Sequence, residues 1–222
     1  MSYRQEYFAF QDKQPVKAVV RRYMEKDFDR LIAVQKECFP PPFPEELWWN
    51  KEQLQNHVRL FPEGALCVEI NGEIAGSMTA LIVDYQPGDT HSWEQITDNG
   101  YIRHHTPAGN TLYVVDISVR PSYRKLGIAK KMMQAMYETV IQLNLDRLLG
   151  GGRMPGYHVY AADMTPEDYL EQVAAGQLVD PVVTFLMRVG RLPVGVLHDY
   201  LQDEESGNCA ALMEWKNPFK NS

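Results

Sequence analysis

The sequence has few cysteines, no excess of positive charge and no long apolar run. Its three cysteines, Cys38, Cys67 and Cys209, are odd in number, lie far apart and form no CxxC pair, which argues against a disulfide framework and a cysteine zinc site. The 22 Lys and Arg against 29 Asp and Glu give a net charge of −7, which argues against a non-specific nucleic-acid binder. Free thiols suit a reducing compartment.

Apolar stretches are interrupted by charges before they reach the roughly 20 residues that a membrane-spanning helix needs. The polar and aromatic segment Met1–Lys17 lacks the apolar centre of a secretory signal. We therefore expect a cytoplasmic location, with neither nucleic acid nor membrane as a partner. The 222 residues, 45% of them hydrophobic, suit a globular chain that needs no disulfide or structural metal.

Helix and strand patterns alternate along the chain without a linker or a repeat, which predicts a single α/β domain. The clearest signal is a hairpin of strands 65–70 and 73–83 around Asn71-Gly72. Apolar spacing and capping residues predict further helices over 25–38, 47–61, 127–143, 166–175 and between Asp180 and Gly190. Further strands are expected over 16–23, 111–119, 192–196 and 209–215. Another is expected to start over 147–149 and to end in Gly150-Gly151-Gly152. Residues 84–110 are expected to form a long functional or mobile loop.

The most informative segment runs from Val114 to Ala129. It joins an apolar strand and a proline corner to a basic, glycine-bearing turn and an amphipathic helix. The first amides of a helix lack internal acceptors, and the helix dipole adds positive charge there, so the segment favours an anion. Gly127 and Ala129 allow a phosphate group to approach the backbone, and Arg124 and Lys125 add charge. The segment predicts a diphosphate ligand.

Two common nucleotide-binding loops do not account for this ligand. The segment lacks the GxGxxG fingerprint of dinucleotide-binding domains. Residues 151–156 have the glycine spacing of a Walker A loop, but Tyr157 and His158 stand where that loop needs lysine and a hydroxyl. A nucleotide-binding switch is therefore disfavoured.

Val119, Pro121, Arg124, Gly127 and Ala129 match the pattern V-x-P-x-x-R-x-x-G-x-A between a strand and a helix. This segment resembles the acetyl-CoA signature of the GNAT superfamily of N-acetyltransferases. The order of elements is also similar over most of the chain, and segments 98–103, 152–157 and 180–185 resemble the GNAT domain often fused to carbon–nitrogen hydrolases.

The resemblance implies one GNAT-type domain over residues 1–222, with 1–15 as an extension. Its α/β fold has a mixed, mostly antiparallel central sheet, splayed in the middle, with helices on both faces. Dimers are common in such folds, so a homodimer is among the expected states.

The resemblance also implies acetyl-CoA as co-substrate and no metal. Strand backbone should pair with pantetheine, an N–H near Val119 should stabilise the oxyanion, turn amides should hold the pyrophosphate, and Lys130 or Lys131 should reach the adenosine phosphates. The predicted acetyl-CoA-binding residues are Ile117, Ser118, Val119, Arg124, Lys125, Leu126, Gly127, Ile128, Ala129 and Lys130.

The catalytic acid and base are less clearly marked. An amine with a pKa of about 10 must lose a proton before it attacks. Asp116 is the predicted base, with a structural carboxylate as the equal alternative, and Tyr113 is a weaker candidate. In many GNAT enzymes a tyrosine on the helix after the fifth strand protonates the departing thiolate, and Leu186 stands at that position here. Tyr157, His158 or Tyr160 is the predicted replacement, with structural or exposed roles as the alternative.

We therefore expect an N-acetyltransferase that moves the acetyl group of acetyl-CoA to a primary amine, on a small molecule or a peptide. Direct attack in a ternary complex is favoured because no cysteine lies in a nucleophile setting. The alternative is a non-catalytic acyl-CoA-binding or regulatory module. Arg103 and Arg153 either bind an acidic group of the substrate or lie solvated at the surface.

Overall fold

The computed structural model describes residues 3–41 and 43–220, whose strands form one sheet in the order β1-β2-β3-β4-β5-β6-β8-β7. The strands are β1 (Arg4–Gln11), β2 (Gln14–Arg22), β3 (Ala65–Ile70), β4 (Glu73–Val83), β5 (Thr111–Val119), β6 (Arg147–Arg153), β7 (Leu192–Leu197) and β8 (Ala210–Lys216). The α-helices are α1 (Phe28–Cys38), α2 (Lys51–Leu60), α3 (Trp93–Thr97), α4 (Ile128–Gln142), α5 (Pro166–Ala174) and α6 (Val183–Arg188).

The sheet divides at the junction of β5 and β6, the one parallel pair among the described strands. This junction has only three residue pairs, from Thr111 with Arg147 to Tyr113 with Leu149. Beyond Tyr113, β5 continues to Val119 while paired with β4 alone. The prediction of a mixed, mostly antiparallel sheet that is splayed in the middle is confirmed.

A β-bulge lies beside the splay. Thr79 of β4 pairs with Asp116 but Ala80 pairs with Val114, so Val115 is an extra residue in β5. A bulge bends its strand and increases the local twist. It follows the last β5–β6 pair directly, so β5 bends where it leaves β6.

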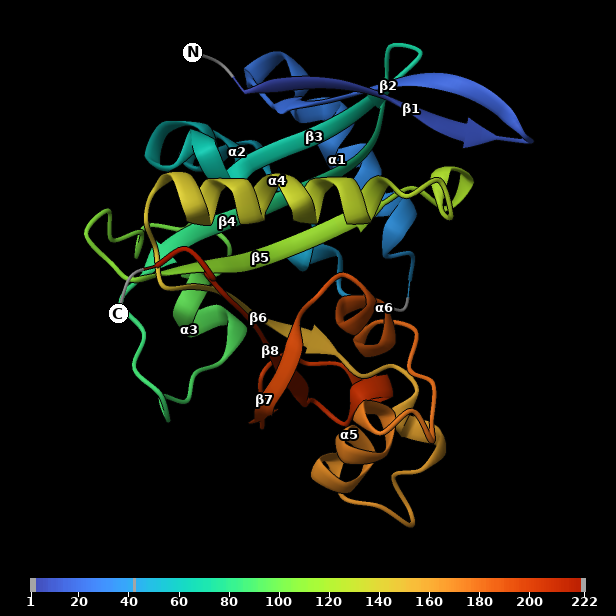
Figure 1. Ribbon diagram of the computed structural model, residues 1–222, viewed down its shortest axis with the longest axis vertical. Coiled ribbons are helices and arrows are strands. Elements are labelled where there is room, and N and C mark those ends of the chain that lie inside the picture. The colour runs from blue at the N-terminus through green and yellow to red at the C-terminus, as the bar shows by residue number, and fades with distance from the viewer. Residues whose placement is uncertain (1–2, 42, 221–222) are drawn as a thin grey trace.

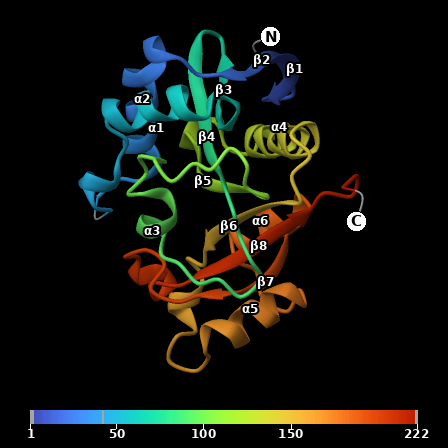
Figure 2. The ribbon, with the colours of Figure 1, turned by 90° about the vertical axis from the view of Figure 1, so that its left-hand side faces the viewer.

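Helices cover both faces of the sheet, as predicted. α4 packs across β3, β4, β5 and β6, while α1 packs against β4 and β5 from the other side. Figure 2 shows the strands between α1 and α2 on one side and α4 on the other. Figure 1 shows β1–β5 with α4 in one part of the molecule and β7, β8, α5 and α6 in the other, joined through β6.

Local signals placed several elements correctly. The hairpin strands β3 and β4 have the predicted bounds, and Asn71 and Gly72 both have positive φ. α5 begins after Thr165, whose side chain accepts a hydrogen bond from the backbone of Asp168. The helix expected from residue 47 begins later, at Lys51, because Asn50 caps it by accepting from the Gln53 amide at 2.9 Å.

The strand expected to end in Gly150-Gly151-Gly152 ends one residue later, at Arg153, because β8 pairs along all three glycines and Arg153. Two other segments differ from the expectation. The segment 84–110 contains the short helix α3, capped by Ser92. Of the expected extension 1–15, β1 pairs with β2 along its whole length at the edge of the sheet.

None of the helices in 3–41 and 43–220 combines the length and apolar content that crossing a membrane requires.

Candidate active site

A cavity of about 530 Å³ opens where β5 and β6 separate. Its wall comes from α1, the segment after it, β5, β6 and α6. Most of the lining side chains are apolar: Phe39, Phe43, Leu47, Trp49, Trp93, Val114, Val115, Ile117, Val119, Val182, Phe185, Leu186 and Leu201. A concave apolar cavity with a few polar groups is typical of a small-molecule site.

Asp116 is the one carboxylate among the described residues that line this cavity. Gln35, on α1, donates from Nε2 to Asp116 Oδ2 at 2.9 Å, and Ser118 Oγ donates to the same oxygen at 2.9 Å. Gln35 Nε2 also lies 3.0 Å from Ser118 Oγ. The strand and the helix packed on it therefore hold the carboxylate in one orientation.

Burial raises the pKa of Asp116 to about 7, although the hydrogen bonds from Ser118 and Gln35 act in the opposite direction. A carboxyl group with this pKa exchanges protons near neutral pH, which suits a general base. Desolvation disfavours the charged form because the cavity wall around Asp116 is largely apolar.

The turn before α4 has the geometry of an anion site. Gly127 has φ +76° and caps the helix, and Lys125 has φ +68°. No atom lies within 4 Å of the position that a Cβ on Gly127 would take, so the turn is open there. Within the described part of the chain, the amides of Lys125 to Ala129 have no hydrogen-bond acceptor. These amides are free to bind an anionic group.

The predicted acetyl-CoA-binding residues occupy two adjoining places. Ile117, Ser118, Val119, Arg124 and Ala129 line the cavity itself. The others lie in the turn and the first helical turn that follow Arg124; they are Lys125, Leu126, Gly127, Ile128 and Lys130. The structure thus brings the strand edge and the helix N-terminus to one cavity.

Tyr157 and His158 lie elsewhere. Both belong to a short 3-10 helix, Tyr157–Val159. The Tyr157 hydroxyl donates to the Met164 carbonyl at 2.9 Å, and the exposed His158 ring lies with Nδ1 2.7 Å from the Pro155 carbonyl. Neither is among the described residues that line the cavity, so the structure does not bring these two predicted acids to Asp116.

A different tyrosine lines the cavity. The Tyr200 hydroxyl lies 3.0 Å from the Tyr113 hydroxyl, which lies 2.8 Å from Nε2 of the half-buried His91. Burial raises the pKa of Tyr200 to about 12, so its phenol keeps its proton. Sequence reasoning missed Tyr200 because its hydrogen-bonded row with Tyr113 and His91 is assembled from three segments that lie far apart in the sequence. A Cβ on Gly151 would lie 2.4 Å from the Tyr200 ring, so glycine is what makes room for it.

The two arginines that the sequence offers as binders of an acidic substrate group are already paired with carboxylates. Arg103 pairs with Asp98. Arg153 lines the cavity but donates to both carboxylate oxygens of Asp203, at 2.6 and 2.7 Å.

Cys38 also lines the cavity. Burial raises the pKa of this thiol to about 11, and the nearby Asp116 charge acts in the same direction. The side chain is therefore a protonated thiol rather than a reactive thiolate at neutral pH.

A sheet splayed beside a glycine-capped helix, with a cavity between, offers backbone groups and an anion site to one extended ligand. The family model described as Acetyltransferase (GNAT) family matches residues 28–160, and the chain belongs to that family. The chain is 57% identical over 201 residues to "Uncharacterized N-acetyltransferase YkwB" of Bacillus subtilis (strain 168). The aligned region covers 90% of this chain and 89% of the relative. Family and relative together support acyl transfer.

The chain is also similar to a longer protein of the same organism and to a solved structure. The chain is 40% identical over 203 residues to "Probable hydrolase YhcX" of the same organism. The aligned region covers 90% of this chain but only 39% of the relative. Among solved structures, the GphF GNAT-like decarboxylase in complex with isobutyryl-CoA has a TM-score of 0.71 at 19% identity, covering 89% of this chain and 98% of that one. At that identity the likeness shows the fold alone.

Proposed function

We propose that the protein is an acetyl-CoA-dependent N-acetyltransferase that acetylates a primary amine by direct attack. One observation carries the proposal: a single cavity joins an unpaired strand edge, unsatisfied helix amides and a buried carboxyl group whose pKa is about 7. The first two suit an acyl-CoA, and the third suits a general base.

The chain's backbone is suited to hold acetyl-CoA. The open edge of β5 from Ile117 to Val119 offers main-chain groups to the pantetheine amides, because β6 no longer pairs there. The amides of Lys125 to Ala129 face an open turn at the positive end of α4, which favours the pyrophosphate. Bound in this way, acetyl-CoA supplies an activated thioester carbonyl at the centre of the cavity.

Side chains then move protons on either side of that carbonyl. Asp116 accepts a proton from the ammonium form of the substrate, and the freed amine nitrogen forms a bond to the carbonyl carbon. An N–H of β5 stabilises the oxyanion. As the carbon–sulfur bond breaks, Tyr200 donates its proton to the sulfur, while the nitrogen releases its second proton to solvent. Solvent then reprotonates Tyr200 through His91 and Tyr113.

The protonated thiol of Cys38 supports direct transfer of the acetyl group to the amine. Cys38 is a protonated thiol at neutral pH, because burial raises its pKa to about 11. No histidine lies among the described cavity residues to activate it. A covalent acetyl-enzyme therefore lacks an activated nucleophile.

Substitution of Gly127 by Glu tests the cofactor site. A carboxylate at this turn repels the pyrophosphate, and we expect acetyl-CoA affinity to fall by about 100-fold or more in isothermal titration calorimetry. Gly176→Glu is the matched control, because Gly176 also has positive φ and no atom within 4 Å of its Cβ position, yet it follows α5. Unchanged affinity in Gly127→Glu would remove the assignment.

Activity is a separate measurement. Release of free CoA from acetyl-CoA is followed with a panel of amines that includes peptides with free N-termini. Tight binding without CoA release for any amine would instead indicate a non-catalytic acyl-CoA-binding module.

A further inference from the structure

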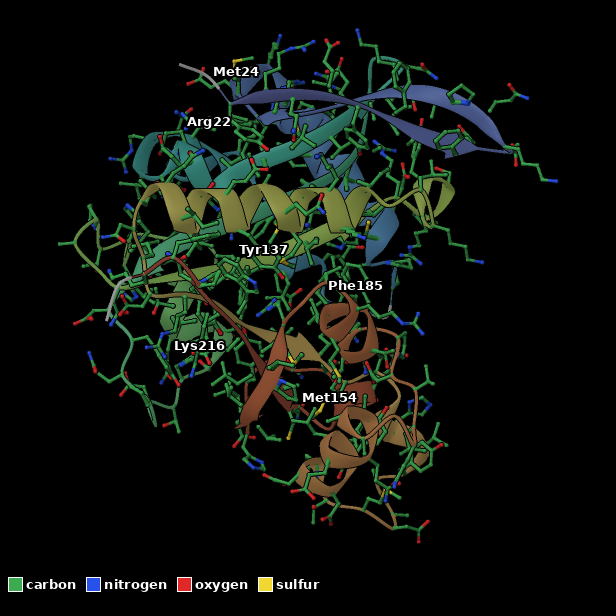
Figure 3. All side chains as sticks on the ribbon, in the orientation of Figure 1. Arg22, Met24, Tyr137, Met154, Phe185 and Lys216 are labelled. Carbon is green, nitrogen blue, oxygen red and sulfur yellow. The ribbon has the colours of Figure 1, made fainter. Side chains whose placement is uncertain are left out.

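Arg191 is a buried cation in the wall of the cavity. It stands between α6 and β7 and is only 2% exposed, and it is one of the cavity-lining residues. Phe185 and Leu186 of α6 line the same wall, and Phe185 lies on the side of α6 that faces β5 and α4 (Figure 3). Tyr113, Tyr137 and Tyr200 also lie near the guanidinium, but a buried charge without a counter-ion is costly.

The hydrogen bonds of Arg191 leave most of its donors unused. Nη2 donates to the carbonyl oxygens of Gly150 at 2.9 Å and Met213 at 2.6 Å. Nε is enclosed and has no partner, and Nη1 donates to no group in the described part of the chain. Residues 3–41 and 43–220 hold no carboxylate within 4.0 Å of this guanidinium, in contrast to Arg153 with its partner Asp203.

The local sequence makes room for this group. A Cβ on Gly150 would lie 3.1 Å from Arg191 Nη2, so glycine at that position allows the guanidinium to approach β6. Burial lowers the pKa of Arg191 to about 10, which still leaves it charged at neutral pH. A buried charge that keeps unused donors in the wall of a cavity favours an anionic group of the ligand that occupies the cavity.

We propose that Arg191 binds a carboxylate of the substrate, so that the cavity accepts a ligand with a free carboxylate close to the reacting centre. The Nη1 N–H groups, which have no partner in the described part of the chain, can donate charge-assisted hydrogen bonds to a carboxylate, and the largely apolar wall strengthens the attraction. The inference rests on the proposed function for the place of the reacting centre. The carboxylate comes either from a dicarboxylic acyl group on CoA, such as malonyl, or from an amino-acid acceptor.

The wild-type protein distinguishes these two sources. Calorimetry compares malonyl-CoA with acetyl-CoA, and initial rates of CoA release compare alanine with ethylamine, which differ by one carboxylate. We expect at least a tenfold preference for the carboxylate in one of the two comparisons, and that comparison identifies the source. Equal values in both would overturn the proposal even if acetyl-CoA binds and reacts.

Binding of free malonate tests the carboxylate site at Arg191 without any thioester. It should raise the melting temperature of the wild-type protein, and Arg191→Met should abolish that shift. If acetyl-CoA fails to bind while malonate still does, the proposed function fails and the carboxylate site stands. No malonate effect and no carboxylate preference would remove the site.

Arg191→Met should also reduce the carboxylate preference by tenfold or more while acetyl-CoA affinity changes by less than threefold. Arg191→Lys keeps the charge but loses the guanidinium N–H donors, so it should retain part of the preference. It also provides the test if the methionine variant does not fold. Arg147→Met is the matched control, because Arg147 lies on β6 outside the cavity lining and pairs with Glu214. An equal loss in Arg147→Met would show a structural effect instead.

Discussion

Asp116 and His57 show how strongly burial decides the protonation of single residues in this protein. Burial raises the pKa of the Asp116 carboxyl group to about 7 and lowers that of the His57 imidazole to about 4. Both groups are held by hydrogen bonds, yet desolvation is the largest cause in each case. Burial favours the neutral form of both residues. Asp116 therefore stays protonated to a higher pH than a free carboxyl group, and His57 stays deprotonated to a lower pH than a free imidazole.

Asp116 is expected to control the pH dependence of acetyl transfer. A general base acts in its ionised form, so the rate should rise with pH through about 7 and then level off. Asp116→Asn keeps the acceptor for Gln35 and Ser118 but cannot take a proton. We expect its kcat to fall by about 100-fold or more with an unchanged acetyl-CoA affinity. A pH profile that is the same in both proteins would assign Asp116 a structural role.

His57 is expected to make the fold sensitive to acid. Its ring lies between the Tyr23 hydroxyl, 2.9 Å from Nδ1, and the Gly100 carbonyl, 2.6 Å from Nε2. The unfolded chain takes up a proton below the ordinary pKa of 6.5, whereas the folded protein does so only near 4. The stability from His57 is therefore full above pH 6.5 and is lost as the pH falls toward 4.

Urea unfolding at pH 7 and pH 4.5 measures this effect. The pKa difference of His57 corresponds to a loss of about 2 kcal/mol in the free energy of unfolding between pH 7 and pH 4.5. The loss should be smaller in His57→Gln than in wild type, and the exposed His158→Gln should behave like wild type. A wild-type loss that persists in full in His57→Gln would place the sensitivity in other groups.

Individual elements were predictable where a few neighbouring residues determine them. The Asn71-Gly72 turn and the Thr165 cap act within a few residues, so β3, β4 and α5 were predicted almost to the residue. The three glycines of β6 were expected at the end of their strand, and they lie directly before its last residue, Arg153. Their partner in the sheet is β8, some 60 residues later, and no local pattern reports such a partner.

The glycines of β6 give a test at the scale of one strand. Gly151→Ala places a Cβ 2.4 Å from the Tyr200 ring, so the ring or the strand must move. We expect a loss of about 1–3 kcal/mol in the free energy of unfolding, together with slower CoA release. Gly195→Ala on β7 is the control, because no atom lies within 4 Å of its Cβ position. Equal effects of both substitutions would show that the contact with Tyr200 is unimportant.

The candidate site was predictable only in part for the same reason. The turn from Arg124 to Ala129 carries its chemistry in contiguous residues, so a sequence pattern reveals it. Tyr200 and Arg191 enter the cavity from the C-terminal part of the chain, and their partners lie on β5, β6 and β8. Only the folded molecule brings these groups together.

At the scale of the whole molecule, two parts meet at the short junction of β5 and β6 (Figure 1). The cavity takes residues from both parts, from Gln35 and Asp116 on one side to Phe185 and Tyr200 on the other. A ligand in the cavity therefore adds contacts across the junction. Its binding should stabilise both parts together.

A thermal-shift experiment measures this coupling. Acetyl-CoA at 100 times its Kd should add about 2.7 kcal/mol, which corresponds to a rise of roughly 5–10 °C in Tm for a domain of this size. Hydrogen exchange should slow on β5 beyond Tyr113 and on β6 alike. Gly127→Glu should show neither change. Protection confined to α4 would show that the ligand does not reach the junction.

The unpaired edge of β5 also bears on how such proteins diverge. Every residue except proline carries the same N–H and C=O groups, so a ligand that pairs with this edge places no demand on the identity of Ile117 or Val119 beyond strand conformation. Selection for binding can then act on the turn while Ile117 and Val119 vary among the residues that suit a strand. Relatives with little similarity along this strand can therefore keep the same ligand, and a search that weights strand residues would overlook them.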